Sequence, residues 1–124
     1  TFCRCVMPAS TEPRSGLSFG WSLGESNWNT GMDANLLSIG RFAYHLSIKD
    51  RDLATPPGSP AAGDTYIVAA TPTGAWAGQD GKVAVWSGTA WVFGTPRIGW
   101  VAYVEDEEKL CVYKAAGWSA GVAL

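Results

Sequence analysis

Tryptophan and glycine recur together in the second half of the chain. Five of the seven tryptophans fall in the last fifty residues, each within a few positions of a glycine. They are Trp76, Trp86, Trp91, Trp100 and Trp118. Tryptophan brings a large apolar area, and glycine permits the backbone conformations that tight turns need. The pattern therefore predicts short β-strands joined by hairpins.

Strand and turn signals follow one another closely after a proline-rich connector at residues 54–60. Asp80-Gly81 between two apolar runs is a strong signal for a tight hairpin. We expect short strands at residues 65–69, 74–78, 82–86, 91–93, 99–104 and 110–113. The predicted fold class is mainly β, a small antiparallel sandwich or open barrel of short hairpins over residues 50–124.

The period of the apolar residues changes before this connector. Thr30 followed three residues later by Asp33 resembles a capping box, and the acid suits the positive end of a helix dipole. One apolar stripe has the alternating spacing of four and three that is typical of a heptad seam. Its members are Met32, Leu36, Ile39, Ala43 and Leu46. We therefore expect one N-terminal α-helix within residues 27–49.

A second apolar stripe, with Leu37, Tyr44 and Ile48, lies on another face of the expected helix. A helix with two apolar faces has two surfaces to cover, and one β-domain covers only one of them. We expect the first stripe to be an oligomer interface in a homotrimer. The alternative is a helix buried within its own chain, because about two heptads are fewer than the three to four of a coiled coil.

The first 26 residues are rich in proline, serine, glycine and threonine, with isolated apolar side chains among them. Leu17, Phe19, Trp21 and Leu23 occupy every second position, which is typical of an extended arm or edge strand. An uncovered arm that carries Phe19 and Trp21 is unfavourable in water. We therefore expect residues 1–26 to form an extended arm that lies against a neighbour.

Composition excludes several classes of function. Hydrophobic residues make up 47% of the chain and charged residues 16%, which indicates a globular domain with a surface poor in charge. The formal net charge of −2 does not provide the basic surface that phosphate backbones require, so we expect no nucleic-acid partner. No apolar run approaches the roughly 18 residues of a membrane span, so we expect no membrane insertion.

The chain has three cysteines, Cys3, Cys5 and Cys111. Cys3 and Cys5 are too close in sequence to bridge each other, and Cys111 lies in an apolar run. The odd number permits intermolecular disulfides from Cys3 and Cys5. The alternative is two unpaired thiols and one small core residue. One CxC, a distant cysteine and the lone His45 lack the spacing of a metal site, so we expect none.

Acidic residues are the remaining candidates for chemistry. Asp50 and Asp52 lie in an expected connector, and the acidic run at residues 105–108 lies in an expected turn. Solvated carboxylates are ordinary in such places. No nucleophile elbow, phosphate loop or metal motif accompanies them. We expect a protein that is not an enzyme and needs no cofactor.

A set of short elements in fixed order between residues 50 and 118 resembles a known family. The elements are Asp50-Arg51-Asp52-Leu53 with Pro56-Pro57, Gly63-Asp64-Thr65-Tyr66-Ile67-Val68, Gly74-Ala75-Trp76-Ala77-Gly78, Ala84-Val85-Trp86, Trp91-Val92-Phe93, Gly99-Trp100 and Gly117-Trp118. They resemble a domain of formally unknown function found in tail fibre, spike and appendage proteins of tailed bacteriophages, prophages and gene transfer agents. The resemblance implies a virion protein, and no catalytic residues are established for that family.

From the surface poor in charge, the two-faced helix and this resemblance, we expect a structural component of a bacteriophage-like virion. It would be a tail fibre, spike, decoration or adaptor, and its partners would be copies of itself and other virion proteins. The alternative is a glycan-binding module for host surface polysaccharide. Trp76, Trp91 and Trp118, near predicted turns, are the candidate glycan contacts, unless they fill the core and the subunit contacts.

Overall fold

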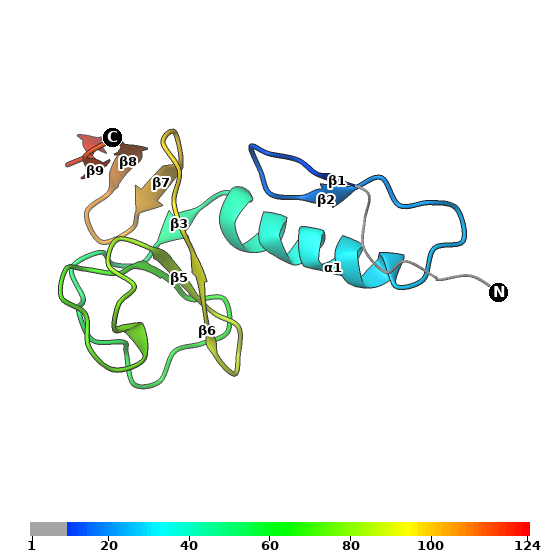
Figure 1. Ribbon diagram of the computed structural model, residues 1–124. Coiled ribbons are helices and arrows are strands. Elements are labelled where there is room, and N and C mark those ends of the chain that lie inside the picture. Colours follow the sequence, from blue (N-terminus) through cyan, green and yellow to red (C-terminus); the bar gives the residue numbers. More distant parts are fainter. Residues whose placement is uncertain (1–9) are drawn as a thin grey trace. The chain divides into compact units, whose positions relative to one another are not determined.

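The computed structural model describes residues 10–124. More of these residues lie in β-strands than in helices, and the described part contains one α-helix. The chain divides into two compact units, Thr1–Tyr44 and His45–Leu124. Figure 1 shows the helix and a small hairpin in the first unit and the larger sheets in the second. The predicted fold class, mainly β with one N-terminal helix, is confirmed.

The helix begins earlier than the sequence predicted. Helix α1 spans Trp28–Ser38, and Asn27 before it has a left-handed φ of 64°. No side chain caps the first turn, and the N–H of Thr30 donates to the carbonyl of Asn27 at 3.2 Å. Thr30 is thus inside the helix, and the predicted capping box with Asp33 is wrong. Asparagine tolerates the left-handed conformation, so the chain can turn sharply into the helix here.

The helical segment also ends earlier than predicted. It continues from α1 into a π-helical turn, η1 (Ile39–Ala43), and Tyr44 is extended. The last residues of the expected helix form strand β3 (Ser47–Ile48), which pairs with β7 (Val101–Val104). Because Ile48 is fully buried at this pairing, the sheet overrides the helical period of the sequence. The predicted helix boundary at residue 49 is wrong.

The described part of the N-terminal arm is a hairpin rather than an extended arm. Strand β1 (Ser10–Thr11) pairs antiparallel with β2 (Ser18–Phe19), and Figure 1 shows the pair alongside α1. Asn35 of the helix accepts a hydrogen bond from the N–H of Ser18 at 2.9 Å and donates its Nδ2 to the carbonyl of Ser18 at 2.8 Å. This segment therefore packs against the helix of its own chain.

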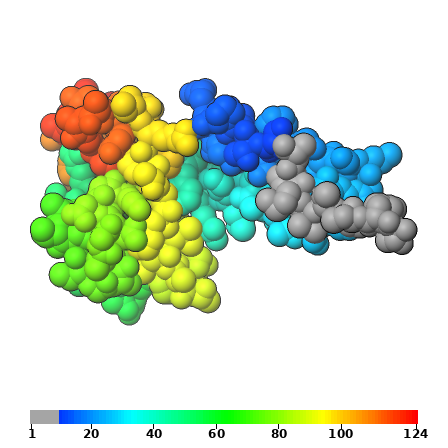
Figure 2. All heavy atoms as spheres, viewed as in Figure 1, coloured from blue at the N-terminus to red at the C-terminus, as the bar shows by residue number. Residues whose placement is uncertain are grey.

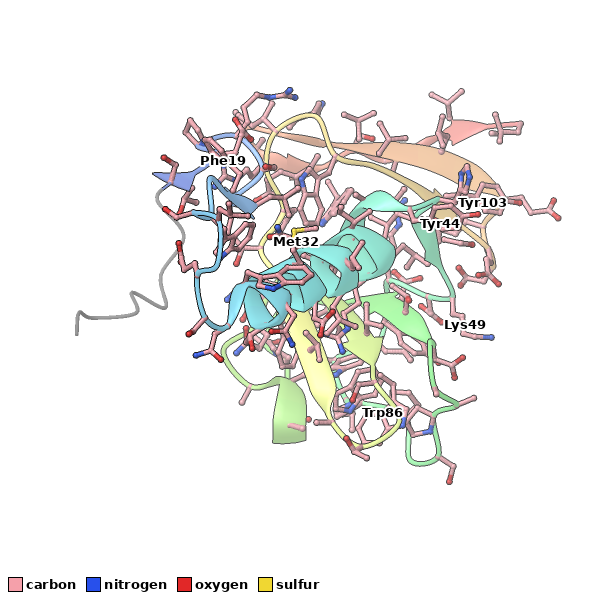
Figure 3. The ribbon with its side chains drawn as sticks, turned by 90° about the vertical axis from the view of Figure 1, so that its right-hand side faces the viewer. Phe19, Met32, Tyr44, Lys49, Trp86 and Tyr103 are labelled. Carbon is pink, nitrogen blue, oxygen red and sulfur yellow. The ribbon has the colours of Figure 1, made fainter. Side chains whose placement is uncertain are left out.

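Trp21 packs on the same helix at Gly31. A Cβ atom at Gly31 would overlap Cζ2 of the indole and lie 3.1 Å from its Cε2. The ring therefore approaches the helix backbone more closely than any residue with a side chain would allow. Figure 3 shows Phe19 on the hairpin and Met32 on the helix that it accompanies.

The second unit contains the larger sheets. One has the strand order β4-β5-β6, and the other has the order β10-β8-β7-β3, with β9 paired to β8. Only the β3–β7 pair among these is parallel. The bounds are β4 Thr65–Ile67, β5 Val83–Trp86, β6 Trp91–Gly94, β8 Lys109–Lys114, β9 Gly117–Trp118 and β10 Val122–Ala123. Figure 2 shows the green residues around β5 packed directly against the yellow residues that follow.

The segment at residues 46–53 joins the two sheets. On one side, the N–H of Glu105, just after β7, donates to the carbonyl of Ile48 at 2.7 Å. On the other side, the N–H of Lys49 donates to the carbonyl of Thr65 in β4 at 2.8 Å. The two sheets therefore share one extended segment, and no closed barrel forms among residues 45–124.

Trp76 organises the core beside β4-β5-β6. The strand predicted at residues 74–78 is wrong, because this segment forms a one-turn 3-10 helix, η2 (Gly74–Trp76). The tight turn directs the indole inward, and Trp76 is 0% exposed. It shares a cluster with Tyr66, Val68 and Ala84, against which Leu53, Trp91 and Phe93 pack.

Candidate functional site

The three tryptophans expected as glycan contacts have different surroundings. Trp76 is fully buried, so it cannot present a ring face to a sugar, and its assignment as a glycan contact is wrong. Its Nε1 has no hydrogen-bond partner among the described residues. The buried reading, in which this tryptophan fills the core, is the one that the structure supports.

Trp91 is half-buried at the edge of the same cluster. Its ring meets Trp76 edge to face, with centroids 5.1 Å apart, and Trp86 in the same way at 5.2 Å. Trp86 and Trp91 are directly opposite in the β5–β6 register, and Trp86 is labelled in Figure 3. Cross-strand aromatic pairs of this kind stabilise a hairpin, and Trp91 as a residue stays partly exposed.

Trp118 is also half-buried, and its polar atom is engaged. The indole Nε1 donates to the carbonyl of Gly81 at 2.9 Å, and the ring meets Tyr113 edge to face at 5.1 Å. This hydrogen bond ties β9 to the turn before β5. The geometry indicates a structural role for Trp118.

The predicted oligomer stripe is open over most of its length. None of the residues of α1 is buried, and Leu36 is 60% exposed. Met32 is half-buried, whereas Ile39 and Ala43 are exposed. Leu46 belongs to the second unit, where its carbonyl accepts the N–H of Tyr103 at 3.0 Å, so its place in a helical stripe is wrong.

The second apolar stripe is open as well. Leu37 is 51% exposed and Tyr44 is also exposed, whereas Ile48 lies in β3. The contacts described for the helix with its hairpin are at Gly31 and Asn35, on another side of α1. Within the first unit, the helix therefore carries more apolar surface than the hairpin covers.

A cluster of carboxylates forms where residues 46–53 meet the β7–β8 turn. Asp50, Asp52 and Asp106 each place an oxygen within 4.8 Å of the others. Sequence reasoning placed Asp50 and Asp52 in a connector and Asp106 in a turn, and it did not bring them together. The two-residue spacing of Asp50 and Asp52 could have indicated part of this cluster, because residues two apart lie on one face of an extended segment.

Arg51, between Asp50 and Asp52 in the sequence, makes a second set of contacts. Its Nε and Nη2 donate to the two carboxylate oxygens of Glu107 at 2.9 and 2.8 Å. Nη1 donates to the carbonyl of Ser119 and Nη2 to that of Ala120, both at 2.7 Å. This paired hydrogen bond raises the pKa of Arg51 and lowers the pKa of Glu107. Arg51 thus holds the β7–β8 turn and the C-terminal segment together.

The electrostatics of the carboxylate cluster are unfavourable as they stand. Partial burial, followed by the negative charge of Asp50, raises the pKa of Asp106. Carboxylate oxygens are the ligands that Ca²⁺ and Mg²⁺ prefer, but Ca²⁺ takes about six to eight of them. Exposed acidic groups are also common without an ion. The cluster is chemically able to contact a cation, and by itself it does not define a metal site.

The cysteine predictions divide between two regions. Cys3 and Cys5, the candidates for intermolecular disulfides, lie outside the described residues. Cys111 is free and fully buried. Its place in β8, directly opposite Ala102 of β7, is that of a small core residue.

The comparison with known families bears on the whole of this arrangement. The family described as "Protein of unknown function (DUF2793)" matches residues 33–119, more than half of the chain. The chain belongs to this family. The DUF2793 match begins inside α1 and ends beside β9, so it includes the sheets, Arg51 and the carboxylate cluster. No curated protein and no solved structure gives a significant match.

Length and apolar character decide whether a helix can cross a lipid bilayer. Within residues 10–124, no helix has the length and apolar character needed to cross a membrane.

Proposed function

We propose that this protein is a non-enzymatic structural component of a bacteriophage-like virion, acting in assembly or host attachment. It would serve as a tail fibre, spike, decoration or adaptor and reside on the particle. The observation that carries the proposal is the open apolar surface of α1, where Leu36 and Leu37 are more than half exposed. Surfaces of this kind mark contacts with other proteins. The resemblance of residues 50–118 to a family of phage proteins adds the class of particle.

The stripe of Met32, Leu36, Ile39 and Ala43 would join copies of the chain, as a homotrimer. Light scattering on the full chain under reducing conditions would give a mass that is a multiple of three times 13.1 kDa. Leu36→Gln removes apolar area from the stripe and would lower that mass. A monomer at all concentrations for the wild-type chain would contradict the trimer.

Association with particles tests the proposal as a whole. Particles are purified on a density gradient from a culture that produces them and probed with an antibody raised against the purified chain. We expect the chain to sediment with the particles and Leu36→Gln to be depleted from them, with Lys114→Gln as an exposed control in the second unit. If the particles contain no chain while the supernatant does, the proposal is wrong.

A glycan-binding module is the second candidate, and the accessible part of the Trp91 ring is the observation that favours it. Aromatic faces stack on sugar rings, and the partner would be a host surface polysaccharide. Trp91→Leu would abolish binding on a glycan array while keeping apolar bulk, and Trp118→Leu would leave it unchanged. An array on which the wild-type chain binds nothing would remove this candidate.

A further inference from the structure

One row that runs from α1 into the π-helical turn η1 carries two opposite charges, an exposed Asp33 and a half-buried Arg41. Asp33 and Arg41 are the only charged residues between positions 28 and 43. Neither side chain has an ion pair with another residue in the described range 10–124. Leu37 lies midway between them in the sequence. Residues four apart share one row on an α-helix, and the single π-helical turn at η1 keeps Arg41 close to that row. Along the helix, the row therefore presents an acid, then a leucine, then a base.

This row faces away from the hairpin that covers the helix. At about 100° per residue, Asp33 and Leu37 lie on the side of α1 opposite to Gly31 and Asn35, which contact the hairpin. Leu37 is 51% exposed. Beside the row, the space where a Cβ at Gly40 would stand is open. A second helix can therefore approach closely here.

We propose that a second copy of this chain packs antiparallel on this row. Leu37 lies against Leu37 of the other copy, and Asp33 of each copy pairs with Arg41 of the other. Positions 33 and 41 are equally far from 37, so one two-fold axis near Leu37 makes both ion pairs at once. The same axis sets Ala34 opposite Gly40, two small residues at the point of closest approach.

Charge complementarity selects this direction and this occupant. In a parallel pair, Asp33 would face Asp33 and Arg41 would face Arg41, because the two positions are about two turns apart along the helix. Like charges in contact are destabilising. Only the antiparallel pair brings the opposite charges together. Each copy then supplies an Asp33 to pair with Arg41 of the other.

The inference rests on the proposed self-association and specifies a contact that the trimer does not use. The stripe of Leu36 and Ile39 and the row of Asp33, Leu37 and Arg41 occupy different sides of the helix. Both contacts can therefore form in one assembly. Two trimers joined through one such row contact contain six copies.

Charge exchange on the full chain tests the pairing by analytical ultracentrifugation under reducing conditions. In Asp33→Arg and in Arg41→Asp, both ion pairs become like-charge contacts, so the two-fold contact weakens by about tenfold or more. The double variant Asp33→Arg with Arg41→Asp restores both pairs and the wild-type mass. Unchanged helix content by circular dichroism shows that each variant is folded.

The outcomes separate this inference from the proposed function. A mass of three chains in the wild type and in every variant overturns the two-fold contact and leaves the trimer standing. A monomeric wild type overturns both. Mass loss in the single variants that the double variant does not restore also overturns the pairing of Asp33 with Arg41.

A cross-linking experiment tests the direction independently. In a background with Cys3→Ser and Cys5→Ser, a mixture of Ala34→Cys chains and Gly40→Cys chains should form disulfide-linked pairs on oxidation. Either variant alone should form few, because the antiparallel pair keeps identical positions apart. Efficient cross-linking of Ala34→Cys alone would indicate parallel helices and overturn the proposal.

Discussion

Gly31 occupies a helix position where its own propensity is unfavourable. Glycine costs about 1 kcal/mol relative to alanine in a helix interior. The indole of Trp21 rests where a side chain would stand, so the backbone of α1 becomes the surface on which the loop before the helix packs. Apolar contact between ring and backbone offsets the loss of helix propensity.

Gly31→Ala should therefore destabilise the first unit despite the better helix propensity of alanine. Its Cβ would overlap the indole, and overpacking of this kind typically costs about 1–3 kcal/mol. Gly40→Ala is the matched control, because nothing lies within 4 Å of its Cβ position. Urea unfolding followed by circular dichroism at low protein concentration measures both. Stabilisation by Gly31→Ala would contradict the packing of Trp21.

Asp106 bears a charge that its surroundings disfavour, since its pKa is raised by partial burial and by Asp50. A carboxyl with a raised folded pKa stabilises the fold only while protonated, so it detracts from stability at neutral pH. Asp106→Asn should raise the free energy of unfolding at pH 7 by no more than about 0.5 kcal/mol. The gain should vanish as the pH falls below the ordinary aspartate pKa. A loss of stability at pH 7 would show that the charge is needed.

Among the elements, the β7–β8 turn and the C-terminal segment depend on one guanidinium. Arg51 makes two hydrogen bonds to Glu107 and one each to the carbonyls of Ser119 and Ala120. All four acceptors face a planar donor fork, a geometry that lysine does not reproduce. Strands β8, β9 and β10 thus remain joined through a side chain from a distant segment.

Glu107→Gln should lower stability at neutral pH and flatten its dependence on acid. The pKa of Glu107 is lowered in the fold, so its stabilisation is present above the ordinary glutamate pKa and is lost as the pH falls through the folded pKa. We expect a loss of about 1–2 kcal/mol at pH 7 and a smaller loss in acid, below the ordinary glutamate pKa. Urea unfolding across this range measures it, with Glu108→Gln as the exposed neighbour control. Equal losses at both pH values would indicate a steric effect.

The segment that joins the sheets should be the most sensitive element of the second unit. Ile48→Ala would leave a cavity between β3 and its neighbours and cost about 2–5 kcal/mol. Ser47→Ala, at the exposed position beside it, should cost much less, because it removes only the hydroxyl hydrogen bond to Glu105. Thermal unfolding compares the two. Similar losses for both would argue against Ile48 as a core residue.

These elements also show what sequence reasoning could reach. The tryptophans marked strands β5, β6 and β9, because apolar alternation is a local signal. The hairpin predicted at Asp80-Gly81 does not form, because the residues before it form η2 rather than a strand. The partner of β3 was not predictable, because Ile48 continues a helical period and its burial depends on β7, far along the chain. Trp76 was misassigned for the same reason. Its neighbours Tyr66 and Ala84 come together only in the folded sheet.

On the scale of the whole molecule, two compact units share one chain and few charges. Part of the apolar surface of the helix was visible in the sequence, and the exposure of Leu36, Leu37 and Ile39 shows that the hairpin leaves these residues largely uncovered. The hairpin itself was not foreseen. Its contact depends on Asn35 and Gly31, and each of these by itself reads as a weak helix former.

Cys111 offers a reporter for the second unit as a whole. Its thiol is fully buried in β8, so a thiol reagent should reach it only when the unit opens. In a Cys3→Ser and Cys5→Ser background, we expect labelling to be slow in buffer, fast in denaturant and faster in Ile48→Ala than in wild type. Rapid labelling of the native chain would contradict the packing of β7 on β8.

The shared segment at residues 46–53 also constrains the order in which the strands can pair during synthesis. Ser47 and Ile48 leave the ribosome early, yet their parallel partners in β7 are Tyr103 and Val104. Loop closure over such a distance is slow relative to local hairpins and helices. The helix and the β4–β5–β6 hairpins can form while the chain is still growing, whereas β3 waits for almost the entire described sequence. Until then one edge of β3 has no strand partner, and unpaired strand edges on a nascent chain are prone to aggregation.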